Sequence, residues 1–115
     1  MTLPETDVVR VRRWVEARNA RLPERAVGLI RYEMDVDSRS ITILECRPPW
    51  REGFGTEWTR RPIARLRHTK VRRDWQIYWR DRNLKFHAYD LVDPTPNIEA
   101  LLAHLDDDPT GIFWG

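Results

Sequence analysis

The first part of the chain has apolar residues at the spacing of an α-helix. Val8, Val11 and Val15 are three or four residues apart, and Trp14 lies beside them in the sequence. A helix with this spacing has one apolar face, which packs on a core, and one charged face, which meets water. The pattern therefore predicts an amphipathic helix over residues 5–18.

A second helical pattern lies near the end of the chain. Its apolar positions are Ile98, Leu101, Leu102 and Leu105. Thr95 is a suitable N-cap and Pro96 a suitable first helical residue, because the N–H that proline lacks has no partner in a first turn. We therefore predict a helix that follows Thr95 and runs to about residue 106.

Between the two predicted helices, the pattern changes to the two-residue alternation of β-strands. Three such segments lie at residues 27–36, 41–46 and 63–68. The second of them is apolar on both faces, which favours a central strand. Parallel strands would need long crossovers that the chain lacks, so we expect antiparallel pairing.

The stretch at residues 75–89 predicts a β-hairpin that supplies the fourth and fifth strands. A two-residue turn at residues 82–83 would place Trp79 opposite Phe86 and Tyr78 opposite His87, and asparagine tolerates the left-handed backbone of such a turn. One face of this hairpin would be apolar and the other basic and aromatic.

Together these elements predict one α+β domain over residues 1–115. Its five-stranded antiparallel sheet would carry the N-terminal and C-terminal helices on its Trp-rich face. Such a core would use several of the 6 Trp of the chain. The expected core consists of Leu66, Trp75, Ile77, Trp79, Leu84 and Phe86, packed against Val8, Val11, Val15, Leu101 and Leu105.

Residues 47–62 interrupt the alternation with three Pro, two Gly and two Trp. Proline lacks the N–H that an interior strand needs, so we expect a long loop here. The apolar tail at residues 112–114 needs shelter from water. We expect it to fold back beside Trp50, Phe54 and Trp58 of this loop in a monomer; the alternative is a homodimer that buries two tails.

Charge is unevenly distributed along the chain. Residues 47–89 carry 12 Lys and Arg against 4 Asp and Glu, whereas residues 90–115 carry 6 acids and no Lys or Arg. The basic middle could meet an anionic partner, or it could pair with the acidic end of the same chain.

The outward face of the predicted three-strand meander is basic and aromatic and holds no acid. Cations follow phosphates and rings stack on bases, so this combination is typical of single-stranded nucleic-acid binding. The alternative is a solvated face whose cations pair with Asp106, Asp107 and Asp108 or with a neighbouring strand. The candidate ligand-binding residues are Arg47, Trp50, Trp58, Arg65, Arg67, Tyr78, Arg80, Lys85, His87 and Tyr89.

The acids at Asp35, Asp37 and Glu45 offer a weaker, enzymatic interpretation. Two acids can hold a divalent cation in a nuclease, but Arg47 stands where such a site needs a group able to accept a proton. We expect Glu45 to pair with an arginine such as Arg47 instead. One Cys and three scattered His give no metal-ligand spacing, so no metal site and no cofactor are expected, and Cys46 is expected to be buried.

These observations favour a non-enzymatic binding module for an anionic ligand such as nucleic acid. A metal-dependent nuclease-like enzyme and a protein-protein interaction or structural domain remain the alternatives. The sequence has no basic leader followed by an apolar run and no long apolar segment, so we expect a cytoplasmic protein without membrane association.

Several Trp-rich motifs carry a resemblance that covers nearly the whole chain. They are ECRPPW at 45–50, EWTR at 57–60, WQIYWRDRN at 75–83, KFHAYD at 85–90 and DPTGIFWG at 108–115. With these motifs the chain resembles a family of small bacterial proteins of unassigned function, domain-of-unknown-function family 3024. At Phe86 the family more often has Trp. The resemblance implies no activity and no catalytic residue.

Overall fold

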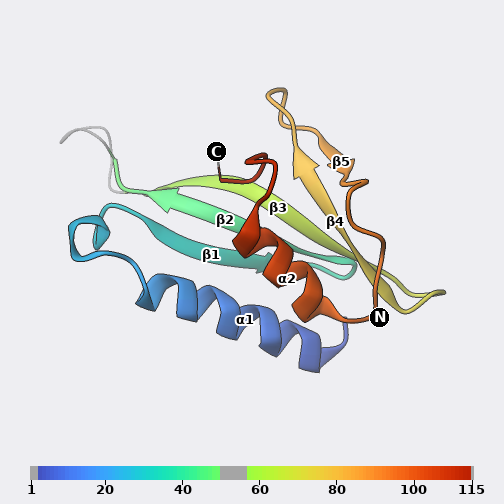
Figure 1. Cartoon of the computed structure of the whole chain (residues 1–115). Coiled ribbons are helices and arrows are strands. Elements are labelled where there is room, and N and C mark those ends of the chain that lie inside the picture. Colours follow the sequence, from blue (N-terminus) through green and yellow to red (C-terminus); the bar gives the residue numbers. More distant parts are fainter. Residues whose placement is uncertain (1–2, 50–56, 115) are drawn as a thin grey trace.

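The computed structural model describes residues 3–49 and 57–114 (Figure 1). The elements are α1 (Glu5–Ala20), the 3-10 helix η1 (Glu24–Ala26), β1 (Arg31–Val36), β2 (Ser40–Arg47), β3 (Thr59–Thr69), β4 (Asp74–Arg80), β5 (Phe86–Ala88) and α2 (Ile98–Asp107). The five strands form one antiparallel sheet in the order β1-β2-β3-β4-β5. Figure 1 shows α1 and α2 on the same side of this sheet. The predicted fold class is confirmed.

The core lies between the two helices and the face of the sheet that they cover, which we call the inner face; the opposite one is the outer face. The fully buried side chains of the core include Val11, Ile41, Leu66, Trp75, Ile77, Leu101 and Leu105. Trp75 is 0% exposed, and its indole N–H donates to the Asp7 carboxylate at 2.9 Å. This bond satisfies the one polar atom of the largest core side chain. Trp79 and Val8 are only partly buried against this core.

The predicted register of the β4–β5 hairpin is wrong by one residue. The structure pairs Trp79 with His87 and Arg80 with Phe86. The connection between the strands is one residue longer than predicted, because Asp81 pairs with Lys85 across a three-residue turn and not with Leu84 across a two-residue turn. The extra residue is Leu84, which has a left-handed backbone (φ 68°) and is 66% exposed. A one-residue slip moves every side chain of a strand to the other face.

Because of this slip, two residues expected in the core lie outside it, and two residues expected on the outer face lie on the inner side. Leu84 lies in the turn, and Phe86 lies on the outer face, where Arg65 stacks on its ring at 4.1 Å. His87 faces Trp79 on the inner side, and Tyr89 is buried there. Neither Leu84 nor Phe86 therefore belongs to the core.

Helix α2 begins later than predicted, at Ile98, and its N-cap is Asn97. The Asn97 side chain accepts the backbone N–H of Glu99 at 3.2 Å. Thr95 instead exchanges two backbone hydrogen bonds with Trp75, so that it extends the edge of the sheet beside β4. Thr95 therefore pairs with Trp75 in the sheet, although its local preference is for a helix N-cap.

Two strands also differ in extent from the prediction. Strand β1 begins at Arg31 because η1 and a turn at Gly28 (φ 82°) occupy the residues before it. Strand β3 begins at Thr59, inside the expected loop, and contains Pro62. This part of β3 pairs only with β2, since β4 pairs with residues 64–69. One side of Pro62 therefore faces no strand, and its missing N–H breaks no ladder there.

The end of the chain folds back onto the helix side of the sheet. Asp108 ends α2 in a left-handed conformation, and its carboxylate accepts the backbone N–H groups of Phe113 and Trp114. Phe113 is 3% exposed, packs on Tyr89, and is followed by Trp114, whose indole N–H donates to the Leu105 carbonyl at 2.7 Å.

Among the described residues, the tail contacts its own domain beside α1 and β1. Trp114 lies against Trp14 and Tyr32. Of the three loop residues expected there, Trp58 stacks on Arg31, whereas Trp50 and Phe54 lie outside the described residues. Among the helices of the described ranges, none has the length and apolar content needed to cross a membrane.

Candidate functional site

The outer face of β3, β4 and β5 gathers cations and aromatic rings. Alternation along β3 and β4 brings Arg65 opposite Tyr78 and Arg67 opposite Gln76, and β5 adds Phe86 opposite Arg80. These residues point away from the helices because their neighbours Leu66, Trp75 and Ile77 point into the core. We call this set the basic face; its members are Arg65, Arg67, Gln76, Tyr78, Arg80 and Phe86.

One cation of the basic face is held in place by the sheet itself. The Arg65 Nε–H donates to the Thr42 hydroxyl at 3.0 Å, and its guanidinium lies over the Phe86 ring. Such contacts fix the stem of the side chain while the terminal nitrogens stay able to donate. Arg65 is therefore a positioned donor rather than a freely rotating one.

Within the described ranges, none of the three arginines of the basic face forms an ion pair. The acids near the end of the chain lie elsewhere. Asp106 accepts from the Trp14 indole and from Arg18, and Asp108 accepts from the tail. Both sit at the end of α2, on the helix side of the sheet (Figure 1). They do not neutralise the basic face.

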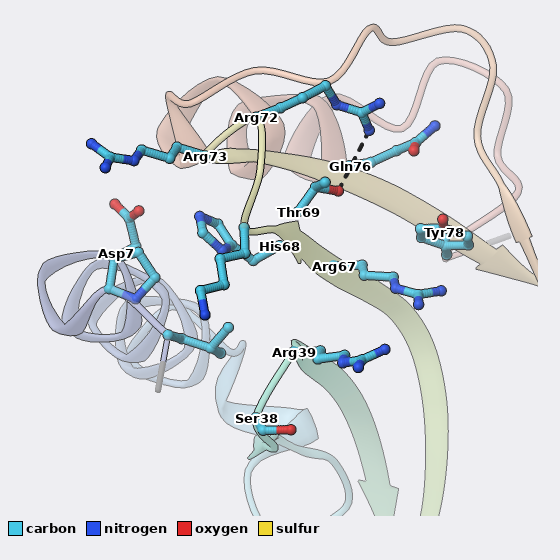
Figure 2. Close-up of a pocket in the computed structure, with 13 residues that line it drawn as sticks. Asp7, Ser38, Arg39, Arg67, His68, Thr69, Arg72, Arg73, Gln76 and Tyr78 are labelled. Atoms are coloured by element: carbon cyan, nitrogen blue, oxygen red, sulfur yellow. Dashed lines mark hydrogen bonds between the residues drawn. The ribbon is translucent and has the colours of Figure 1, made fainter. Parts of the chain in front are cut away.

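A cleft of about 910 Å³ opens at one end of the basic face, where the β3–β4 turn meets the β1–β2 turn and the start of α1. Its cations are Arg39, Arg67, Lys70, Arg72 and Arg73. Figure 2 shows Arg39 and Arg67 extending in the same direction, whereas Arg73 extends in the opposite direction. We call this the turn cleft. Arg67, Gln76 and Tyr78 belong to both the cleft and the basic face.

Sequence reasoning missed four cations of the turn cleft. Arg39, Lys70, Arg72 and Arg73 lie in turns, where the alternation of strands assigns no face. The backbone N–H of His68 donates to the Arg39 carbonyl at 2.8 Å, and this contact between β3 and the β1–β2 turn joins the two groups. The run from Lys70 to Arg73, with three cations in four residues, was the only signal in the sequence.

The remaining candidate residues do not join this site. Arg47 pairs with Glu45 at 3.0 Å, and Trp58 lies under Arg31 near the β1 edge. Lys85 lies in the turn before β5. Trp50 lies outside the described residues.

His87 and Tyr89 are engaged on the inner side. The His87 Nε2 lies 2.6 Å from the Asp81 carboxylate, and the Tyr89 hydroxyl lies 3.3 Å from both His104 and Thr110. Asp81 also accepts the backbone N–H groups of Asn83 and Lys85. These donors, the His87 side chain first, lower the pKa of the Asp81 carboxyl.

The three acids of the enzymatic interpretation are not brought together. Asp35 binds Arg60 at 2.7 Å on the outer face, whereas Glu45 lies on the other face, opposite Tyr32. Asp37 closes the β1–β2 turn, and the backbone N–H of Arg39 lowers the pKa of its carboxyl. Within residues 3–49 and 57–114, no group of three His, Cys, Asp or Glu could hold a metal ion.

Cys46 is fully buried on the outer side of β2, opposite Arg60. Burial raises the pKa of its thiol. A thiol with a raised pKa is mostly protonated at neutral pH, so Cys46 itself is not a ready nucleophile.

Comparison with known proteins gives one match. A family model described as a domain of unknown function (DUF3024) matches residues 2–115. No curated protein and no solved structure matches the chain.

Proposed function

The chain belongs to the DUF3024 family of domains of unknown function, and within that family we propose that this protein is a non-enzymatic module that binds single-stranded nucleic acid on its basic face. The observation that carries the proposal is the absence of any acidic partner, in the described ranges, for Arg65, Arg67 and Arg80. Cations left without internal partners attract polyanions from solution.

The arrangement of the basic face supports a strand rather than a small anion. Its three arginines lie on two neighbouring strands. Neighbouring strands are about 5 Å apart, and residues on one face of a strand recur about every 6–7 Å. This spacing resembles the separation of phosphates along an extended strand. Tyr78 lies between these cations, and Phe86 lies beside Arg65, so rings are available for stacking.

The geometry favours single strands over duplex. The site lies on a sheet face, and within the part of the chain that the structure describes both α-helices cover the opposite face, so neither could enter a major groove from the site (Figure 1). Stacking on Tyr78 requires an unpaired base, and such stacking contributes about 1–3 kcal/mol per base. Unpaired bases are therefore the expected partners of the rings.

Binding of a fluorescent oligonucleotide across a range of salt concentrations tests the proposal. Each phosphate contact to a single strand contributes about −0.7 to the slope of log affinity against log salt, so three arginines predict a slope of about −2. Arg67→Gln should weaken binding about tenfold at low salt and reduce the size of that slope by about 0.7. Tyr78→Ala should weaken binding about tenfold and leave the slope unchanged.

Arg12→Gln provides a matched control because it removes the same charge from an exposed position on α1, on the other side of the sheet. Equal losses in Arg12→Gln and Arg67→Gln would mean that net charge alone attracts the oligonucleotide. No affinity for any oligonucleotide at low salt would refute the proposal outright.

A further inference from the structure

The turn cleft differs from the rest of the basic face in the density of its charge. Five cations line one cavity, drawn from the β1–β2 turn, from β3 and from the β3–β4 turn. Arg72 has Asp74 as a partner at 3.3 Å, whereas the other four form no ion pair in the described ranges. The three arginines of the basic face, by contrast, are spread over two strands.

The one acid that lines the turn cleft does not oppose an anion there. Each oxygen of Asp7 already accepts a bond, one from the Arg10 guanidinium at 2.8 Å and one from the Trp75 indole at 2.9 Å. Its charge is paired with Arg10. Thr69, Gln76 and Tyr78 add uncharged donors to the lining.

The position of the cleft matters as much as its charge. It shares Arg67, Gln76 and Tyr78 with the basic face, and Leu3 and Pro4 at the start of α1 also line it. A strand that follows the basic face toward the β3–β4 turn reaches the cleft at the place where β3 ends and β4 begins. Such a cavity suits the end of a ligand and does not suit a chain that continues through it.

We infer that the turn cleft binds the terminal phosphate group of a nucleic-acid strand, so that the protein recognises phosphorylated strand ends; this inference rests on the function proposed above. A terminal phosphate carries about −1.5 to −2 charges at neutral pH, whereas an internal phosphodiester carries only one. A dianion is attracted more strongly than a monoanion by the four cations that form no ion pair in the described ranges, and arginine can bind its oxygens through two parallel hydrogen bonds.

The test compares one oligonucleotide in three forms, with a 5′-phosphate, with a 3′-phosphate and with neither, each carrying its fluorophore away from the end under test. We expect one phosphorylated form to bind about tenfold more tightly than the unphosphorylated form, the gain that one or two charge-assisted hydrogen bonds provide. Equal affinities for all three forms would overturn the inference. Binding of the unphosphorylated form tests the proposed function separately.

Variants inside and outside the cleft test whether the preference for a phosphorylated end arises in the cleft. The double variant Arg39→Gln with Lys70→Gln changes two exposed turn residues of the cleft, and it should abolish the preference while the unphosphorylated strand still binds. Arg80→Gln, outside the cleft, should weaken all three forms equally. The double variant Arg12→Gln with Arg13→Gln controls for the same loss of charge on α1. A preference that survives the cleft variant would overturn the inference.

Two competitors separate a strand end from other phosphate sources. Inorganic phosphate and a nucleoside monophosphate share the dianion but lack the strand that lies on the basic face. We expect both to compete with the phosphorylated oligonucleotide only at concentrations at least about 100-fold higher, because they lose the contacts of the remaining nucleotides. Competition by the nucleoside monophosphate at equal concentration would make the cleft a nucleotide site and reject the strand-end assignment.

Discussion

A single residue in the β4–β5 connection decides which side chains reach the basic face. Leu84 adopts a left-handed backbone that costs most L-residues about 1–2 kcal/mol. Three-residue hairpin loops commonly place glycine at such a position. The Asp81 carboxylate holds this loop closed through the backbone of Asn83 and Lys85. Local side-chain bonds therefore set a register that the alternation of the strand leaves open.

Replacing Leu84 with glycine should stabilise the protein by about 0.5–1 kcal/mol. Glycine removes the left-handed penalty, and the gain exceeds the entropy that glycine adds to the unfolded chain. Little apolar burial is lost, since Leu84 is 66% exposed. Urea denaturation measures the change. Leu84→Ala is the control, because it removes the side chain but keeps the strained backbone. If Leu84 were a strand residue as the two-residue turn requires, glycine would be the more destabilising of the two.

Acid should loosen the same hairpin through Asp81. The lowered pKa of this carboxyl means that its contribution to stability is present above the unfolded value, near 3.8, and is lost as pH falls through the lower folded value. Asp81→Asn cannot ionise. We therefore expect the stability difference between wild type and Asp81→Asn to be largest at neutral pH and to shrink below about pH 4. Denaturation at pH 7 and pH 3 measures it.

Asp93→Asn is the matched control for the acid experiment, since Asp93 is exposed and accepts no hydrogen bond in the described ranges. The difference between wild type and this variant should not change with pH in the same way. A pH-independent difference for Asp81→Asn would argue against a role for its charge.

The sequence predicts the helices and strands but not the ends that tertiary contacts control. The spacing of Val8, Val11 and Val15 predicts α1, and both inner residues Val11 and Val15 are buried as expected. The predicted cap at Thr95 fails because Trp75 needs a backbone partner at the edge of β4. Local preference cannot reveal a competitor that lies 20 residues away in the sequence.

The tail packs as a separate segment, and removing it should destabilise the domain without changing its oligomeric state. Deleting residues 112–115 exposes the surface that Phe113 covers, and truncation of a buried phenylalanine typically costs about 3–5 kcal/mol. Thermal unfolding and light scattering measure the two effects. Phe113→Ala is the milder variant should the deletion fail to fold. A wild-type dimer that becomes a monomer on deletion would show that the tail holds a second copy.

The tail also encloses a cation. The Arg18 guanidinium lies 3.8 Å from the Trp114 ring, 4.9 Å from Tyr32 and 5.5 Å from Trp14, and it pairs with Asp106. Trp114→Ala should therefore also loosen Arg18. The sequence indicated that the tail needs shelter but did not identify this partner, although Arg18 follows Val15 by three residues and so lies on the same face of α1.

For the whole molecule, Cys46 provides a measure of opening. It is the only cysteine, it is fully buried in β2, and its thiol pKa is raised. We expect a thiol reagent to label the native protein more than about 10³-fold more slowly than the urea-denatured chain, because labelling requires the sheet to open. Comparable labelling rates in the two states would contradict this burial. An oligonucleotide that binds the native state should slow labelling further.

The basic face and α2 carry opposite charges, and this separation contributes an electric dipole to the molecule. The basic face and the turn cleft lie at the positive end, while α2 carries three carboxylates and no Lys or Arg at the other. With a net charge of only +2, monopole attraction is weak, so orientation in the field of a polyanion should govern the rate of encounter. The same dipole lets copies align head to tail, and dilute buffer should therefore promote a weak self-association that physiological salt removes.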